Sequence, residues 1–191
     1  MLRSSILERL SGPLCDALLE REGSAKLLDT LARTNLFLLP LDDSGEWYRF
    51  HHLFAQLLRV ELERREPGLA PTLHRRAFAW HRANGARDAA IEHALEGGAF
   101  AEAGELVAAA WIHYIQAARH ATVNAWLDRF PPELVRDNSQ LLLVKAVGVV
   151  HDEEDGAVTA IPETLDRVQL ISGERLGRGE DVDEEVGPGE G

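Results

Sequence analysis

Two adjacent histidines, His51 and His52, stand where the apolar pattern of the chain changes from the period of a strand to that of a helix. A histidine at the start of a helix places an imidazole donor beside backbone N–H groups that lack a partner within the helix, and together these groups favour an anion. The simpler interpretation is that the two imidazoles cap the helix or pack beside Trp47. The residues alone leave both interpretations open.

The remaining paired histidines do not have the spacing of a metal site. His74 and His81 are seven residues apart, as are His113 and His120, so each pair could share one face of a helix two turns apart. Metal ligands on one helix are usually three or four residues apart, and no carboxylate or cysteine completes a set. We therefore predict no metal site.

No other residues suggest catalysis. The single cysteine, Cys15, has the apolar neighbours Leu14 and Leu18, which indicates a buried, inert thiol rather than a nucleophile. No set of nucleophile, base and orienting group is visible, and no paired carboxylates, so we expect no catalytic residues and no enzyme activity. The tryptophans lie on apolar stripes, which favours core positions over base-stacking platforms; they are Trp80, Trp111 and Trp126.

The adjacent histidines lie in the stretch from Asn35 to Glu66. Its apolar run LFLLPL predicts a mostly buried strand, the segment DDSG that follows can reverse the chain, and EWYRF predicts a second, aromatic strand. Pro67-Gly68 ends the helix that begins after His51. One side of this helix carries an apolar stripe made of Leu53, Phe54, Leu57, Leu58, Val60 and Leu62.

Three short helices are predicted before this stretch. The first carries Ile6, Leu7 and Leu10 and ends at Ser11-Gly12-Pro13, the second is LCDALLER, and the third is AKLLDTLART, with Ser24 as a possible cap. We expect their inward-facing residues to be Leu14, Cys15, Ala17 and Leu18 of the second helix and Leu27, Leu28 and Leu31 of the third. Helices followed by a hairpin and another helix predict a winged-helix-like domain over residues 1–66.

Alanine-rich helices follow over residues 69–150. Paired helices with small residues where neighbours must approach are typical of tetratricopeptide-like stacking, and Ala77, Trp80 and Ala89 loosely follow the small–aromatic–small pattern of that repeat. No second copy appears at a fixed period, so an irregular helical bundle remains the alternative. Residues 151–191 are rich in glycine and acidic residues and predict a largely disordered tail. The predicted fold class is therefore mainly α, with one β-hairpin.

The composition restricts the partners. Residues 151–191 hold 3 basic and 13 acidic side chains, so most of the formal charge of −12 lies there and the first 150 residues are nearly neutral. The chain has no basic stripe that would neutralise phosphates, and we expect no direct binding of nucleic acid. No run reaches the ~18 apolar residues that span a bilayer. With one cysteine and no signal peptide, we expect a cytoplasmic protein that does not enter a membrane.

The run LFLLPLDDSGEWYRFHHLFAQLL resembles the winged-helix region of the LuxR-family ATP-dependent regulators of the MalT type, which are signal-transduction ATPases with numerous domains. The resemblance extends through LRSSILERLSGPLCDALL upstream and LHRRAFAWHRANGARDAAIEHAL downstream, and so covers residues 1–130. It implies that Phe50-His51-His52-Leu53 is the sensing motif of that family, in which His51 reaches the phosphate of bound ADP. The chain contains no GxxxxGK[ST] loop, so the nucleotide, ATP or ADP in the complete proteins of the family, would need an ATPase domain, and this chain by itself has no cofactor.

Two functions follow as hypotheses. In the first, the chain is a fragment or truncated relative of a MalT-like regulator, without the ATPase and DNA-binding domains. Its winged helix couples nucleotide state to shape, and its helical repeats bind a protein or small-molecule effector. In the second, the chain is a stand-alone helical-repeat scaffold for protein–protein interaction. The nearly all-apolar segment SQLLLVKAVGVV suits such docking or self-association.

Overall fold

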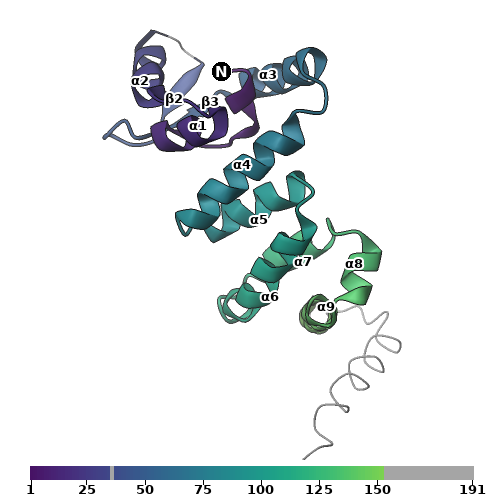
Figure 1. Ribbon diagram of the computed structural model, residues 1–191. Coiled ribbons are helices and arrows are strands. Elements are labelled where there is room, and N and C mark those ends of the chain that lie inside the picture. The colour runs from purple at the N-terminus through teal and green to yellow at the C-terminus, as the bar shows by residue number, and fades with distance from the viewer. Residues whose placement is uncertain (35–36, 153–191) are drawn as a thin grey trace, which may run out of the picture. The chain divides into compact units, whose positions relative to one another are not determined.

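The computed structural model describes residues 1–34 and 37–152, with side chains up to residue 146. The chain divides into two compact units, Met1–Phe130 and the residues from Pro131 onward. The described residues are mainly helical with one small antiparallel sheet, which confirms the predicted fold class (Figure 1). The elements of the first unit are η1 (Arg3–Ile6), β1 (Leu10–Ser11), α1 (Gly12–Leu19), α2 (Ser24–Thr34), β2 (Leu38–Pro40), β3 (Trp47–Phe50), α3 (His52–Arg65), α4 (Ala70–Ala83), α5 (Arg87–Glu96), α6 (Phe100–Gln116) and α7 (His120–Leu127).

The predicted hairpin is confirmed. β2 and β3 pair in antiparallel register, with Leu38 opposite Phe50. The turn between them closes through the Asp42 carboxylate, which accepts hydrogen bonds from the backbone N–H groups of Glu46 at 2.9 Å and Trp47 at 3.1 Å. Gly45 adopts a φ of 68°, which a residue without a Cβ reaches at little cost.

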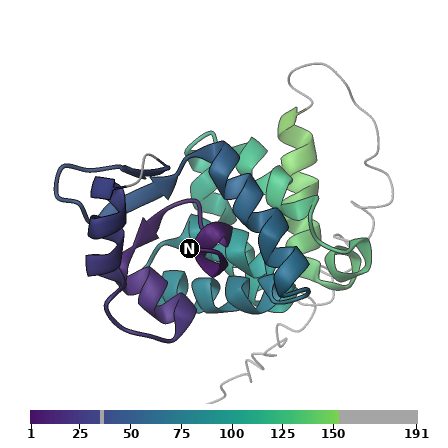
Figure 2. The ribbon, with the colours of Figure 1, turned by 90° about the horizontal axis from the view of Figure 1, so that it is seen from above.

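The prediction of an N-terminal helix through Leu10 is wrong. The helical segment is a single 3-10 turn that ends at Ile6, and Leu10 lies in β1, which pairs with the free edge of β3 opposite Tyr48 (Figure 2). A strand of two residues, Leu10–Ser11, is too short to show a period of its own. The sheet therefore has the strand order β1-β3-β2, with the aromatic strand in the centre.

α1 and α2 pack closely because Gly12 has no side chain. A Cβ at this position would lie 2.6 Å from the Cβ of Ala25, inside any normal contact distance. The Ser11 hydroxyl caps α1 by accepting a hydrogen bond from the Leu14 N–H at 3.4 Å, and Pro13 sits in the first turn, where no N–H is needed.

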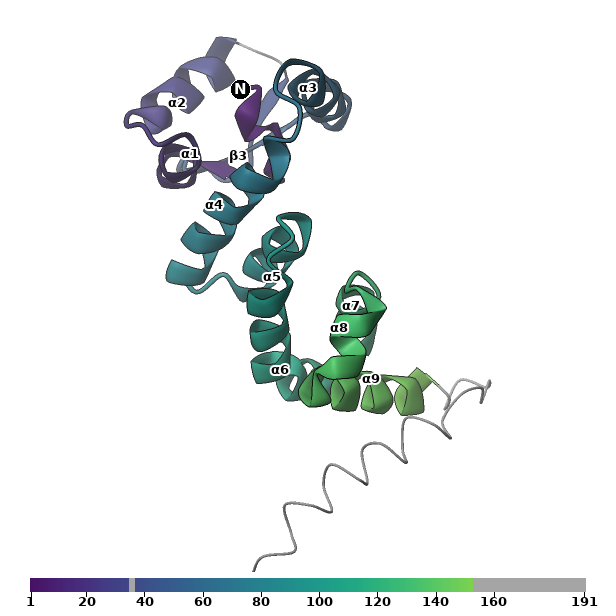
Figure 3. The same cartoon turned by 45° about the vertical axis from the view of Figure 1, so that its right-hand side comes forward.

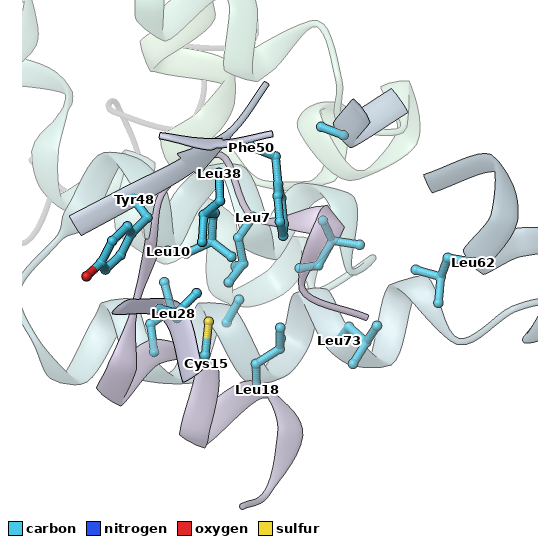
Figure 4. Packing of buried hydrophobic residues seen from close by; sticks show 14 residues of the cluster. Leu7, Leu10, Cys15, Leu18, Leu28, Leu38, Tyr48, Phe50, Leu62 and Leu73 are labelled. Atoms are coloured by element: carbon cyan, nitrogen blue, oxygen red, sulfur yellow. The ribbon is translucent and has the colours of Figure 1, made fainter. Parts of the chain in front are cut away.

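The core of the winged helix continues into α4. Leu73 and Ala77 of α4 belong to the same buried cluster as Leu18 of α1 and Leu62 of α3, and α4 lies against α1 (Figures 3 and 4). The predicted boundaries, residues 1–66 and 69–150, remain predictions. The buried side chains nevertheless join the two sides of the Pro67-Gly68 turn.

Several positions predicted to face inward are exposed. Ala17 and Leu27 lie on the surface, and Leu27 is 41% exposed. Half of the predicted stripe on α3 faces outward: Leu53 and Leu57 are each 62% exposed and Val60 is 69% exposed. Leu62 of the stripe is buried, and Phe54 and Leu58 are partly buried against the core. These changes show that apolar identity alone does not select the buried face of a short helix.

Small residues and aromatic side chains with polar partners lie at the contacts between the helices. Ala90 and Ala94 of α5 are fully buried where α5 packs against α4 and α6. The Tyr114 hydroxyl donates to Asp88, and the Trp126 indole N–H donates to Glu92 at 2.6 Å. Of the three tryptophans predicted as core residues, Trp126 is buried, whereas Trp80 and Trp111 are only partly buried.

The second unit contains α8 (Pro132–Asp137) and α9 (Ser139–Asp152), which pack against each other. Asn138 caps α9, since its side-chain oxygen accepts from the N–H groups of Gln140 at 3.0 Å and Leu141 at 3.1 Å. α9 continues two residues beyond the predicted boundary at 150, and the rest of the predicted acidic tail lies outside the described residues. Within the described part of the chain, every helix is too short or too polar to cross a membrane.

The two faces of α3 give a direct test of this packing. We expect Leu62→Ala to lower the free energy of unfolding by about 2–5 kcal/mol, because it empties a buried site, and Leu57→Ala on the same helix to change it by about 0.5 kcal/mol or less. Urea unfolding followed by circular dichroism measures both. Equal losses for the two variants would contradict the orientation of α3.

Candidate functional site

His51 occupies the N-cap position of α3, directly after the central strand of the sheet. Its backbone N–H donates to the carbonyl of Phe37 at 2.7 Å, and its carbonyl accepts from Ala55 at 2.9 Å. Its side chain makes no capping hydrogen bond, and its ring lies 4.5 Å from that of His52, centroid to centroid. The interpretation that His51 caps the helix through its side chain is therefore wrong.

The first turn of α3 offers backbone donors beside these imidazoles. Because Ala55 is the first residue to bond back to His51, the N–H groups of His52, Leu53 and Phe54 have no partner within the helix. His52 and Leu53 are exposed, and His51 is half-buried. This end of α3 thus has the groups that an anion such as phosphate binds.

An exposed apolar stripe begins at the same end of α3. Leu53, Leu57 and Val60 recur at intervals of four and three residues, which places them on one side of the helix. Each is more than half exposed, while Leu62 of the same helix is buried. The N-terminus of α3 therefore combines polar groups suited to an anion with an apolar surface suited to a protein partner.

A second candidate site lies between the winged helix and the first helical pair. It is a cavity of about 760 Å³, lined from one side by residues of η1, β3 and α3 and from the other by α4 and α5. All of these elements belong to the first unit. Its lining includes Trp47, Arg59, His74, Trp80, His81 and His93.

Three of these residues are histidines in mutual contact. The Nδ1 atoms of His74 and His93 lie 2.9 Å apart, at hydrogen-bond distance, so one ring donates to the other. The ring of His81 stacks on that of His93 with a centroid distance of 5.2 Å and an interplanar angle of 14°. His81 and His93 are buried, and Nδ1 of His81 has no hydrogen-bond partner among the described residues.

Burial keeps this cluster neutral. Burial is the largest cause that lowers the pKa of His93 to about 3, and the neighbouring His74 and His81 contribute to the same shift. Burial likewise lowers the pKa of His81. For His74, burial is again the largest cause of a lowered pKa; the carboxylate of Glu96 opposes it, and the guanidinium groups of Arg59 and Arg129 add to it.

The sequence predicted only part of this cluster. His74 and His81 share the α4 face that turns towards α5, as their spacing predicts, whereas His113 is exposed on α6 and outside the cavity. His93 was missed, because it comes from the neighbouring helix. The available signal was that α4 and α5 are joined by a short turn at Gly85, which lets a histidine of α5 lie beside one of α4.

Neither a metal centre nor a reactive thiol is visible among the described residues. No group of three histidine, cysteine or carboxylate side chains there has the geometry of a metal site, since the three rings stack and pair rather than converge. Burial raises the pKa of the Cys15 thiol to about 11. A thiol that stays protonated at neutral pH is a poor nucleophile.

Comparison with known proteins finds similarity to one family model and to several relatives. Residues 1–70 match the family model of the MalT winged helix domain. The chain is 33% identical over 146 residues to the serine/threonine-protein kinase PknK of Mycobacterium tuberculosis, an alignment that covers 76% of this chain and 13% of the relative. It is 36% identical over 98 residues to the HTH-type transcriptional regulator MalT of Klebsiella pneumoniae, which covers 51% of this chain and 11% of the relative. The corresponding regulator of Vibrio parahaemolyticus is 37% identical over 81 residues, or 42% of this chain and 9% of the relative.

The fold and these matches define a winged helix joined to a set of packed helices. More specifically, residues 1–70 are similar to the MalT winged helix domain, and the resemblance to LuxR-family regulators of the MalT type is confirmed for this part of the chain. The alignment with the kinase is longer than the winged helix, so it continues into the helices that follow. The chain spans only about an eighth of the length of these relatives or less.

The histidine cluster predicts an acid sensitivity. Because its folded-state pKa values lie below the unfolded value of ~6.5, the unfolded chain binds protons first, so stability is complete above that pH and falls as the pH falls towards 3. His93 alone should cost about 2 kcal/mol of unfolding free energy between about pH 7.5 and about pH 5.0. Urea unfolding at several pH values measures this loss.

A matched pair of variants isolates the cluster. His93→Asn removes the titrating ring and should flatten the pH dependence of the unfolding free energy by that amount. His113→Asn alters an exposed histidine on α6 and should leave the wild-type slope. An unchanged slope in His93→Asn would show that the cluster does not titrate on unfolding.

Proposed function

We propose that this chain is a coupling and sensing module of a MalT-like regulator. The winged helix transmits the state of a nucleotide held by an ATPase domain, and the helices after Pro67-Gly68 receive a protein or small-molecule effector. The observation that carries the proposal is the N-terminus of α3, where His51, free backbone N–H groups and an exposed apolar stripe occur together in a MalT-type domain. The chain by itself is proposed to bind no nucleotide, to have no enzyme activity and to act in the cytoplasm.

His51 supplies the polar part of this function. Its imidazole is not used as a helix cap, so it is available to donate to a phosphate oxygen of ADP. The unpartnered N–H groups of the first turn would share the charge of that phosphate. The apolar stripe would meanwhile pack on the ATPase domain, because Leu53 and Leu57 remain in water otherwise.

The relatives support a module that serves more than one kind of protein. The same region occurs in regulators named MalT and in a protein named a serine/threonine-protein kinase. We therefore propose that a nucleotide-coupled winged helix followed by a sensing array can work with different attached functional domains. For this chain the MalT-like regulator is favoured, because the family model of that type matches residues 1–70.

A second candidate is a stand-alone scaffold for protein–protein interaction. The exposed stripe on α3 favours it, since an apolar helix face can bind a partner helix without any nucleotide. The same face would serve for self-association. The two candidates differ in whether the His51 end of the helix matters for binding.

Retention of ADP by a separately produced MalT-type ATPase domain tests the role of His51. Adding this chain should slow ADP release, and His51→Ala should remove most of that effect, because it deletes the phosphate contact. His52→Ala is the matched control: it alters the neighbouring exposed imidazole and should retain the effect. Dissociation of a fluorescent ADP analogue gives the rates.

The outcomes separate the candidates. Equal ADP retention by wild type and His51→Ala would remove His51 from the mechanism. Binding to the ATPase domain that depends on Leu57 but not on nucleotide would favour the scaffold. Isothermal titration of the chain alone should show no binding of ATP, and micromolar affinity would contradict the proposal.

Direct DNA binding offers an independent check. The first 150 residues are nearly neutral and have no basic stripe, so we expect no sequence-selective DNA binding even at low salt. A gel shift with the full chain and a promoter fragment measures it. Tight, selective retardation would overturn this part of the proposal.

A further inference from the structure

The cavity between the winged helix and α4–α5 has the size and lining of a small-molecule site. Its volume of about 760 Å³ lies within the range of known ligand pockets, roughly 300–1,000 Å³. Its residues come from both sides of the Pro67-Gly68 turn, with Trp47 from β3 and Trp80 from α4. A solute here would contact the winged helix and the first helical pair at once.

Aromatic rings form much of the lining. The rings of Trp47 and Trp80 meet edge to face with a centroid distance of 6.4 Å, and the ring of His81 lies edge-on to Trp80 at 5.1 Å. His93 and His74 continue this series of rings. Flat aromatic surfaces of this kind favour a ligand with a flat face, which can stack on one ring and meet the edge of the next.

Buried imidazoles require a ligand with hydrogen-bonding nitrogen or oxygen atoms. Nδ1 of His81 is buried and finds no partner in the part of the chain that the structure describes, which costs free energy unless a further group pairs with it. A purely apolar ligand would leave that cost in place. In the neutral His74–His93 pair one ring donates through Nδ1 and the other accepts, so one Nε2 is left as an acceptor and the other as a donor.

The charges around the cavity oppose an anion. Four glutamates and two arginines line it: Glu8, Glu63, Glu92, Glu96, Arg9 and Arg59. Arg129 pairs with Glu92 and Glu96, whereas Glu8 and Glu63 form no ion pair with another described residue. Both arginines are also partly engaged: Arg59 donates to the Ser5 carbonyl at 2.8 Å, and the Arg9 guanidinium lies 5.5 Å from the Trp47 ring centroid.

We propose that this cavity, lined by Trp47, Trp80 and the histidine cluster, binds a small planar nitrogen compound that is uncharged or carries one positive charge. A nitrogen heterocycle offers donor and acceptor atoms that can pair with the imidazole nitrogens, and its flat face suits the tryptophan rings. One positive charge is balanced by Glu8 or Glu63. The inference deepens the proposed effector-sensing role. The functional consequence of binding rests on that role, whereas the binding itself is tested separately.

Three probes of similar size and different charge test the proposal on the full chain. Benzimidazole is uncharged, benzamidine carries one positive charge and benzoate carries one negative charge near neutral pH. We expect benzimidazole and benzamidine to bind with a Kd of about 1 mM or below, and benzoate at least about tenfold more weakly. Titrations are followed by ¹H–¹⁵N spectra of the four tryptophan indoles.

The tryptophans provide an internal control. Saturable shifts should appear at Trp47 and Trp80, which line the cavity, and not at Trp111 of α6, which does not. Benzoate affinity equal to that of benzamidine would overturn the proposal. So would the absence of saturable shifts with every probe, or shifts as large at Trp111.

Two sets of variants locate the contacts. The double variant Glu8→Gln/Glu63→Gln should weaken benzamidine about three- to tenfold and leave benzimidazole unchanged, because only the charged probe uses the carboxylates. The matched double variant Glu102→Gln/Glu105→Gln, which changes exposed glutamates of α6 outside the cavity, should alter neither. An unchanged ratio of the two affinities in the first variant would contradict the assigned charge selectivity.

His81→Phe keeps a buried ring and removes its nitrogens. Benzimidazole should then bind about tenfold more weakly, with folding checked by circular dichroism. If His81→Phe does not fold, the glutamate variants still decide the result. If His51→Ala retains ADP as well as wild type while the probes bind normally, the proposed nucleotide coupling is rejected and this site stands. If His51→Ala loses ADP retention as expected while no probe binds, only this site is rejected.

Discussion

Burial of Leu73 and Ala77 in the core of the winged helix is the interaction on which the rest of the first unit depends. These side chains of α4 share one apolar cluster with Leu18 and Leu62, so separating α4 from the winged helix would expose apolar surface on both. Each large buried side chain contributes about 1.5–3 kcal/mol. Pro67-Gly68 separates α3 from α4, but the buried core continues across this turn. We therefore expect the winged helix and α4 to move as one body.

α3 serves two surfaces at once, and this explains its apolar composition. Ala55 and Leu62 complete the core, while Leu53, Leu57 and Val60 face outward. A helix that is apolar on two sides needs a partner on the second side or leaves it in water. In the proposed function that partner is the ATPase domain, and the outward stripe begins beside His51, where the nucleotide phosphate would lie.

The sequence predicted the hairpin and the helix order because these depend on local chemistry. The Asp42 turn, Gly45 and the glycines that end α4 and α5 each act within a few residues, and the structure shows each of them in that role. The outward stripe of α3 could not be predicted, because the direction of Leu57 depends on which side of the helix the rest of the core occupies. β1 could not be predicted either, since its two residues gain their strand conformation only by pairing with β3.

The complete histidine cluster could not be predicted from the sequence for a related reason. Spacing along one helix showed that His74 and His81 share a face, but their partner His93 belongs to α5. Only the assumption that α4 and α5 fold back on each other at Gly85 brings His74 and His93 to the same level. A search for metal-ligand spacing along one helix could not have found this pair.

The two candidate sites lie on the same helix, and this gives them a physical connection. His51 occupies the N-cap position of α3, and Arg59, Leu62 and Glu63 towards the other end of the helix line the cavity. With a rise of 1.5 Å per residue, the two positions are separated by roughly 15 Å of rigid helix. In the proposed function, a solute in the cavity acts on α3 because Leu62 lines the same cavity as His81 and His93, and a nucleotide phosphate acts on the same helix through His51. In the proposed function, coupling between effector and nucleotide requires only a small displacement of α3 together with α4, without a pathway through more distant helices.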